Sequence, residues 1–139
     1  MTSAPILLDT CALIWLAGDQ PRSQEAEQAI NDQWSAGSRL VVSPISAWEI
    51  GLLTSKGRLS ISQPVELWWE RLLATEGLTL GAMPPTVLMA SSLLPGTPPN
   101  DPADRIMAAT ARAFGYRLMT RDQRLLAYAQ AGHMQAISC

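Results

Sequence analysis

The chain has 139 residues, of which 47% are hydrophobic and 16% are charged, and its formal net charge is −2. This composition excludes a disordered chain and is typical of one globular domain, predicted to span residues 1–139. Two cysteines, Cys11 and Cys139, provide no disulfide framework. The start of the chain lacks a basic signal-peptide region, and no apolar run approaches the roughly 20 residues of a membrane span. We therefore expect a cytoplasmic protein without a membrane segment.

Short apolar segments that favour strands alternate with longer segments that favour helices. In chain order we predict a strand at 6–8, helices at 10–17 and 24–34, a strand at 40–43, helices from 44 to about 57 and at 64–75, a strand at 78–80, helices at 87–93 and 103–114, a strand at 117–120, a helix at 122–130 and an edge strand at 134–137. This alternation predicts an α/β fold. Its central sheet should have four to five short, mostly parallel strands, with helices on both faces.

Four carboxylates fall near the ends of predicted strands. Asp9 ends the first strand, and Asp122 lies two residues beyond the fourth. Asp104 begins the helix that leads into that fourth strand, and Glu49 lies early in the helix after the second. Ligands of open parallel sheets bind beyond the carboxyl ends of the strands, so we expect these acids to meet there. Their mutual repulsion favours bound magnesium or manganese, which would support phosphodiester hydrolysis.

Each of these acids also has a structural explanation. Asp9 and Asp122 can cap the helices that follow them. Asp101 precedes a proline, a common start of a helix, so we interpret it first as a cap. Asp104 can act as the acid of a capping box, and Glu49 can face solvent.

Charge and tryptophan placement suggest partners. Residues 101–139 contain three acids and five arginines, a net charge of +2, which leaves −4 for the remainder of the chain. A locally basic segment fits a polyanionic substrate, although arginines on helices also simply face solvent. Trp68 and Trp69 are adjacent and cannot both be buried on one helix face, so one of them is expected to meet a neighbouring element or another chain, for example an amphipathic segment.

Several other kinds of site do not fit the sequence. His133 is the only histidine and falls in a predicted turn, which excludes catalysis by a histidine pair. The pattern of a P-loop is absent. Cys11 occupies the position where an aspartyl phosphatase carries its second acid, and Lys56, the only lysine, is poorly placed for a receiver domain.

Four motifs together resemble a known family. Leu-Leu-Asp-Thr at 7–10, Ser-Ala-Trp-Glu-Ile at 46–50, Asp-Pro-Ala-Asp-Arg followed by Ile-Met-Ala-Ala-Thr-Ala at 101–111, and Thr-Arg-Asp at 120–122 occur in the order seen in PIN-domain ribonucleases. Within that family the chain is similar to VapC-type toxins of bacterial toxin–antitoxin pairs. The resemblance implies a PIN-like fold and a magnesium- or manganese-dependent endoribonuclease acting on RNA such as transfer or ribosomal RNA. It also implies a homodimer and a cognate small antitoxin protein.

The resemblance assigns roles to individual residues. It places the catalytic and metal-binding acids at Asp9, Glu49, Asp104 and Asp122. Asp101 matches an accessory acid, Arg105 the arginine of the same motif, and Thr10 and Thr120 the hydroxyl groups that line the site. The sequence departs from the family in having Pro99 and Asn100 where some relatives carry a histidine, and Cys11 where Asn or Ser is commoner. The alternative is a catalytically weak PIN-fold module that acts through association with protein or RNA.

Overall fold

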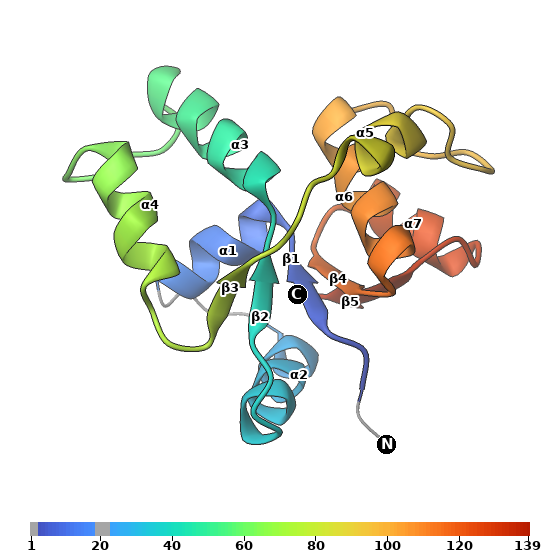
Figure 1. Ribbon diagram of the computed structural model, residues 1–139, viewed down its shortest axis with the longest axis horizontal. Coiled ribbons are helices and arrows are strands. Elements are labelled where there is room, and N and C mark those ends of the chain that lie inside the picture. The colour runs from blue at the N-terminus through green and yellow to red at the C-terminus, as the bar shows by residue number, and fades with distance from the viewer. Residues whose placement is uncertain (1–2, 19–22) are drawn as a thin grey trace.

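The computed structural model describes residues 3–18 and 23–139. Within these residues five strands and seven helices follow one another as β1 (Ile6–Leu8), α1 (Thr10–Ala17), α2 (Gln24–Ser35), β2 (Leu40–Val42), α3 (Pro44–Ser55), α4 (Val65–Leu73), β3 (Leu78–Leu80), α5 (Pro85–Ser91), α6 (Pro102–Phe114), β4 (Arg117–Thr120), α7 (Gln123–Gln130) and β5 (Gln135–Ser138). All neighbouring strands are parallel, in the order β3-β2-β1-β4-β5 (Figure 1). The predicted α/β fold class is confirmed, with five strands.

The element boundaries differ slightly from those predicted. Helix α5 begins at Pro85 and ends at Ser91, before Leu93, whose side chain is 81% exposed. Helix α4 is shorter than predicted at both ends because Pro64 precedes its first turn and Ala74 is already its cap. The predicted edge strand forms as β5, which pairs with β4 along one side.

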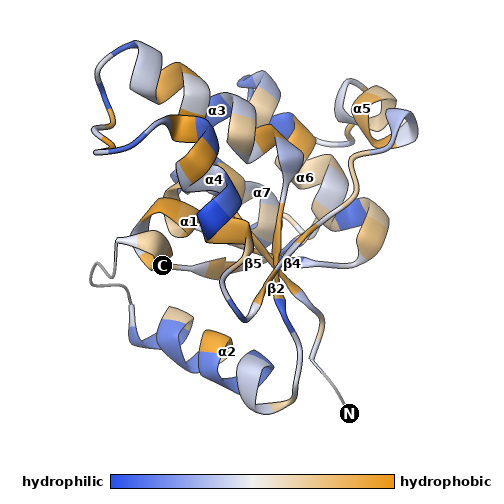
Figure 2. Cartoon of the chain, turned by 60° about the vertical axis from the view of Figure 1, so that its left-hand side comes forward, coloured by the Kyte–Doolittle hydropathy of each residue, from blue (hydrophilic) through white to orange (hydrophobic). Residues whose placement is uncertain are grey.

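The sheet separates two apolar layers. On one face, Ile6 and Leu8 pack with residues of α1, α2 and α4. On the other face, Leu7 and Leu118 pack with α6 and α7. Successive strand residues point to opposite faces, so even three-residue strands supply both layers. Figure 2 shows the apolar residues gathered along the strands and mainly hydrophilic residues along α2.

The strand order places a topological switch point beside the central strand, β1. From β1 the chain builds β2 and β3 on one side, then crosses through α5 and α6 to build β4 on the other. Leu8 pairs with Met119, and the Asp9 amide donates to the Met119 carbonyl at 3.0 Å. The carboxyl ends of β1 and β4 therefore meet at the switch point where such sheets bind ligands. No helix in the described part of the chain is long and apolar enough to cross a membrane.

Candidate active site

Asp9 lies at the switch point, where β1 passes into α1. Its side chain is 6% exposed, and both carboxylate oxygens accept hydrogen bonds. Oδ1 accepts from the Thr10 amide at 2.9 Å, whereas Oδ2 accepts from the Thr120 hydroxyl at 2.6 Å and from the Cys11 thiol at 3.6 Å. Burial nevertheless raises the pKa of Asp9, and the charge of Asp122 adds to the rise. The fold therefore fixes this carboxylate firmly but solvates its charge incompletely.

Glu49 is connected to Asp9 through Thr10. The Thr10 hydroxyl donates to Glu49 Oε1 at 2.6 Å and lies 2.8 Å from the Ser46 hydroxyl. Because the single Thr10 proton is directed at the carboxylate, Ser46 is the donor in the second bond. Burial raises the pKa of Glu49, and the charges of Asp9 and Asp101 contribute to the rise. The first turn of α1 and the start of α3 thus hold two acids in one hydrogen-bonded network.

Asp104 completes an acidic cluster. Its pKa is raised from 3.8 to about 7, first by burial and then by the charges of Asp9, Asp122, Asp101 and Glu49. The charged groups that act on Asp104 in the described residues are thus all carboxylates. The acids expected to meet at the strand ends do come close enough to affect one another's ionisation.

Asp101 and Asp122 are helix caps, as the structural explanation of both predicted. Asp101 Oδ2 accepts from the Asp104 amide at 3.0 Å. Asp122 Oδ1 accepts from the amides of Arg124 and Leu125, at 2.9 and 3.1 Å, and the Asp122 amide donates to the Thr120 hydroxyl at 3.0 Å. The caps fix the start of α6 and α7 and hold both carboxylates close enough to Asp104 for their charges to raise its pKa.

Arg105 and Cys11 take places that sequence reasoning did not foresee. The Arg105 guanidinium donates to the carbonyls of Ser91 and Pro99, at 3.0 and 3.1 Å, so it fastens the segment that precedes Asp101. The sequence assigns Cys11 no part in the site, but its thiol lies against the Asp9 carboxylate. Burial and the charge of Asp9 raise the pKa of its thiol to about 12, which keeps it protonated as a donor to Asp9.

The carboxylate oxygens of these acids are the kind of ligand that a hard divalent cation such as magnesium prefers. Three of the acids have raised pKa values, so bound positive charge would relieve an existing electrostatic cost. In the described part of the chain, no three His, Cys, Asp or Glu side chains are grouped closely enough to form a ready-made cage for an ion. Magnesium does not require such a cage, because it keeps several waters and takes only one or two carboxylates together with substrate phosphates.

Comparison with known proteins places this chain in a family. The family model described as PIN domain matches residues 6–131. The chain belongs to the PIN-domain family. It is 36% identical over 124 residues to Ribonuclease VapC22 of Mycobacterium tuberculosis (strain ATCC 25618 / H37Rv), an alignment that covers 86% of this chain and 88% of that protein. The predicted VapC-type resemblance is thereby confirmed.

Solved structures share this PIN fold at low sequence identity. VapBC2 from Rickettsia felis, bound to a DNA fragment from its promoter, superposes with a TM-score of 0.67 at 13% identity and covers 96% of this chain and 97% of its own. PAE2754 from Pyrobaculum aerophilum superposes with a TM-score of 0.60 at 22% identity, over 97% of this chain and 89% of its own. Both support the fold described above.

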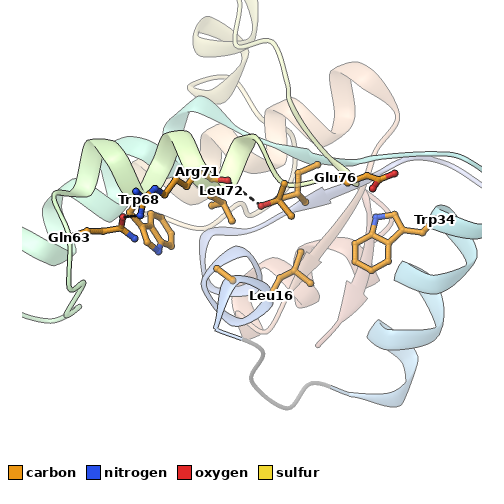
Figure 3. Close-up of a pocket in the computed structure, with 10 residues that line it drawn as sticks. Leu16, Trp34, Gln63, Trp68, Arg71, Leu72 and Glu76 are labelled. Atoms are coloured by element: carbon orange, nitrogen blue, oxygen red, sulfur yellow. Dashed lines mark hydrogen bonds between the residues drawn. The ribbon is translucent and has the colours of Figure 1, made fainter.

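A separate groove of this PIN domain lies between α1, α2 and α4. Its volume is about 380 Å³, and the side chains that line it include Leu16, Trp34, Trp68, Arg71 and Leu72. The close-up in Figure 3 shows Arg71 beside Gln63, to which it donates at 2.8 Å, with Trp34 across the groove. Both Trp68 and Trp69 are partly buried against the core. Sequence reasoning therefore located an incompletely buried tryptophan pair, of which Trp68 faces this groove.

Proposed function

We propose that this PIN domain is a metal-dependent endoribonuclease whose active site consists of Asp9, Glu49, Asp104 and Asp122. The observation that carries the proposal is the acidic cluster around Asp104, in which burial and neighbouring carboxylates raise the pKa to about 7. Perturbed acids gathered in a crevice at the strand ends are typical of functional sites. The identity to a relative named as a ribonuclease supports RNA as the substrate.

We propose magnesium or manganese as the cofactor, held by Asp9, Asp104 and Asp122 and by Glu49 directly or through water. When bound, such an ion lowers the pKa of a water molecule and stabilises negative charge on phosphate oxygens, which makes phosphodiester hydrolysis possible near neutral pH. We assign Asp101 the role of an accessory acid, whose carboxylate caps α6 through the Asp104 amide.

The hydroxyl groups around the acids position them for this chemistry. Thr120 donates to Asp9 and accepts from the Asp122 amide, so one side chain orients two of the proposed ligands. Thr10 links Asp9 to Glu49 through its amide and its hydroxyl. Both threonines are almost completely buried, which excludes water from these bonds. Carboxylates held by such partners bind metal more tightly than free ones.

RNA would approach over the basic end of the chain. Arg121 and Arg124 flank Asp122, and both are exposed. Arginine pairs well with phosphate, so these side chains can receive the backbone of an RNA strand beside the acids. Transfer or ribosomal RNA in the cytoplasm is the substrate class that we propose.

The deciding experiment compares the wild-type protein with Asp9→Asn on total RNA, with manganese present or removed by a chelator. The wild-type protein should cleave RNA only with metal, and Asp9→Asn should fold normally, shown by circular dichroism, but not cleave. RNA cleavage by the variant at the wild-type rate would remove Asp9 from the site. Absence of metal-dependent cleavage by the wild-type protein would instead favour the alternative, a PIN-fold binding module.

We further propose that the groove between α1, α2 and α4 receives a cognate antitoxin. It combines the apolar surfaces of Leu16, Trp68 and Leu72 with the cation of Arg71, which suits an amphipathic helix carrying an acid. Two similar solved structures, VapBC2 from Rickettsia felis and FitAcB from Neisseria gonorrhoeae, support a two-protein assembly. Trp68→Ala should weaken binding to a cognate antitoxin without affecting RNA cleavage, and unchanged binding would exclude the groove.

A homodimer is the assembly that we propose for the toxin itself. Large hydrophobic side chains remain exposed on α3 and from β3 to the end of α5, including Trp48 at 55% and Met89 at 62%. Exposed apolar groups of this size often mark protein interfaces. Sedimentation of the wild-type protein should show a dimer, and Met89→Glu should shift it towards the monomer. A monomeric wild-type protein would contradict the proposal.

A further inference from the structure

A second cavity lies between the loop before α6 and the residues of α7 that face it. Its volume is about 520 Å³. The residues that line it include Thr97, Pro98 and Asn100 of the loop, Arg124 and Ala131 on or after α7, and His133. None of these residues belongs to the proposed catalytic set. The cavity is large enough for a single nucleotide rather than a folded partner.

The chain connects this cavity to the active site at two points. Asn100 directly precedes Asp101, whose carboxylate caps α6 and influences Glu49 and Asp104. Arg124 lies two residues after Asp122, and its amide donates to the Asp122 carboxylate at 2.9 Å. From Arg124 to Ala131 the helix extends the cavity by roughly 10 Å away from the acids. The cavity therefore begins within one or two residues of Asp101 and Asp122 along the chain.

The walls of the cavity are held in place before any ligand binds. The Tyr128 hydroxyl donates to the Pro95 carbonyl at 2.6 Å, and Arg105 donates to the Pro99 carbonyl at 3.1 Å. The His133 ring stacks on Tyr128 with centroids 4.7 Å apart, and its backbone carbonyl accepts from Arg112. Gly96, at φ +72°, lies so close to the His133 ring that a Cβ there would collide with it. A preformed cavity binds its ligand without the cost of ordering the loop.

The chemical character of the cavity matches a nucleotide. Pro98 and Ala131 offer apolar surface to a base, and Thr97 and Asn100 offer hydrogen-bonding groups to its edge. The only hydrogen bond that Arg124 donates within the described ranges, 3–18 and 23–139, is made by its backbone amide, so the charge of its guanidinium is available for a phosphate. Single-stranded RNA is read by this combination of base contacts and phosphate pairing.

We propose that this cavity, the loop 96–100 with Arg124 on α7, is a subsite for one nucleotide of the RNA strand next to the cleaved phosphate. The subsite selects RNA sequence rather than performing chemistry. The proposal rests on the ribonuclease function proposed above. It assigns Arg124 to the phosphate and Asn100 to the base edge.

The binding test uses fluorescein-labelled single-stranded RNA with the Asp9→Asn protein, so that cleavage does not interfere. Arg124→Ala in this background should raise Kd about five- to tenfold and reduce its salt dependence by about one phosphate contact. Ala131→Phe, which fills the cavity and keeps the charge, should also weaken binding. Arg58→Ala removes an equal charge from the loop between α3 and α4 and should change Kd less than about twofold. Equal effects of Arg124→Ala and Arg58→Ala, or tight binding by Ala131→Phe, would overturn the subsite.

A second measurement separates selection from a merely structural role. In the otherwise wild-type enzyme, Arg124→Ala should raise KM and leave kcat within about twofold, because it removes binding shared by the ground and transition states. Asn100→Ala should change the base preference at one position beside the cut without changing the fold. Unchanged KM and preference in both variants refute the subsite, while the ribonuclease itself stands. A wild-type protein that binds the labelled RNA through Arg124 but never cleaves refutes the nuclease and retains the RNA site.

Discussion

Replacing Asp104 by asparagine should stabilise the metal-free protein while abolishing its activity. The pKa of Asp104 is raised from 3.8 to about 7, so the fold disfavours the ionised carboxylate. The penalty is absent below pH 3.8, grows as the pH rises towards about 7 and is complete above it. A rise of about three pKa units corresponds to roughly 4 kcal/mol. Screening at this partly buried side chain and the favourable field at the start of α6 reduce that figure to about 1–2 kcal/mol.

Thermal unfolding in the presence of chelator tests this expectation. At about pH 7.5 the Asp104→Asn protein should unfold at a temperature about 3–8 °C above that of the wild type. The difference should shrink as the pH approaches 3.8, the ordinary pKa of the side chain. Asp32→Asn is the matched control, since Asp32 is exposed on α2 and its replacement keeps an acceptor for Gln28. A lower melting temperature for Asp104→Asn at neutral pH, or a gain that does not depend on pH, would show that the cluster is not electrostatically strained.

Two further predictions concern metal binding. Thr120→Val removes the donor to Asp9 and the acceptor of the Asp122 amide, so the affinity for manganese, measured by calorimetry, should fall about 10- to 100-fold. Thr120→Ser keeps the hydroxyl and should restore most of the affinity. Wild-type affinity in the valine variant would contradict a positioning role for Thr120. Manganese must displace the proton that Asp104 holds up to a pH of about 7, so the affinity of the protein for manganese should rise from about pH 6 to about pH 8. Calorimetry in buffers of different ionisation enthalpy should detect the released proton. Equal affinity at both pH values would argue against Asp104 as a ligand.

The fold was predictable because its signals are local. Ile6-Leu7-Leu8 is a continuous apolar run because both of its faces are buried, and this is what a central parallel strand requires. Gly115, in the left-handed region at φ 69°, ends α6 at the residue expected. The predicted and observed boundaries differ at α4 and α5, because the ends of these helices depend on prolines and exposed residues rather than on a strong apolar pattern.

The candidate site was only partly predictable. The placement of the acids follows from strand ends and topology, so their convergence on Asp104 could be inferred. The roles of Arg105 and Cys11 could not be inferred, because each depends on the partner that the fold places beside it. Arg105 donates to the carbonyls of Ser91 and Pro99. Cys11 donates to the carboxylate of Asp9. His133 lies in the turn after α7, as predicted, but its stacking on Tyr128 could not be foreseen. Contacts between residues far apart in sequence leave no periodic signal to detect.

The short helix α1 joins the acidic cluster to the groove between α1, α2 and α4. Thr10 at its first turn holds Asp9 and Glu49, and Leu16 and Ala17 at its last turn line the groove between α1, α2 and α4. Between them, Trp15 stacks under the guanidinium of Arg121, 3.3 Å from the ring centroid, next to Asp122. A helix of eight residues is about 12 Å long, so α1 reaches from the acids to the groove. A segment docked in the groove therefore contacts the same helix whose first turn holds Asp9 and Glu49.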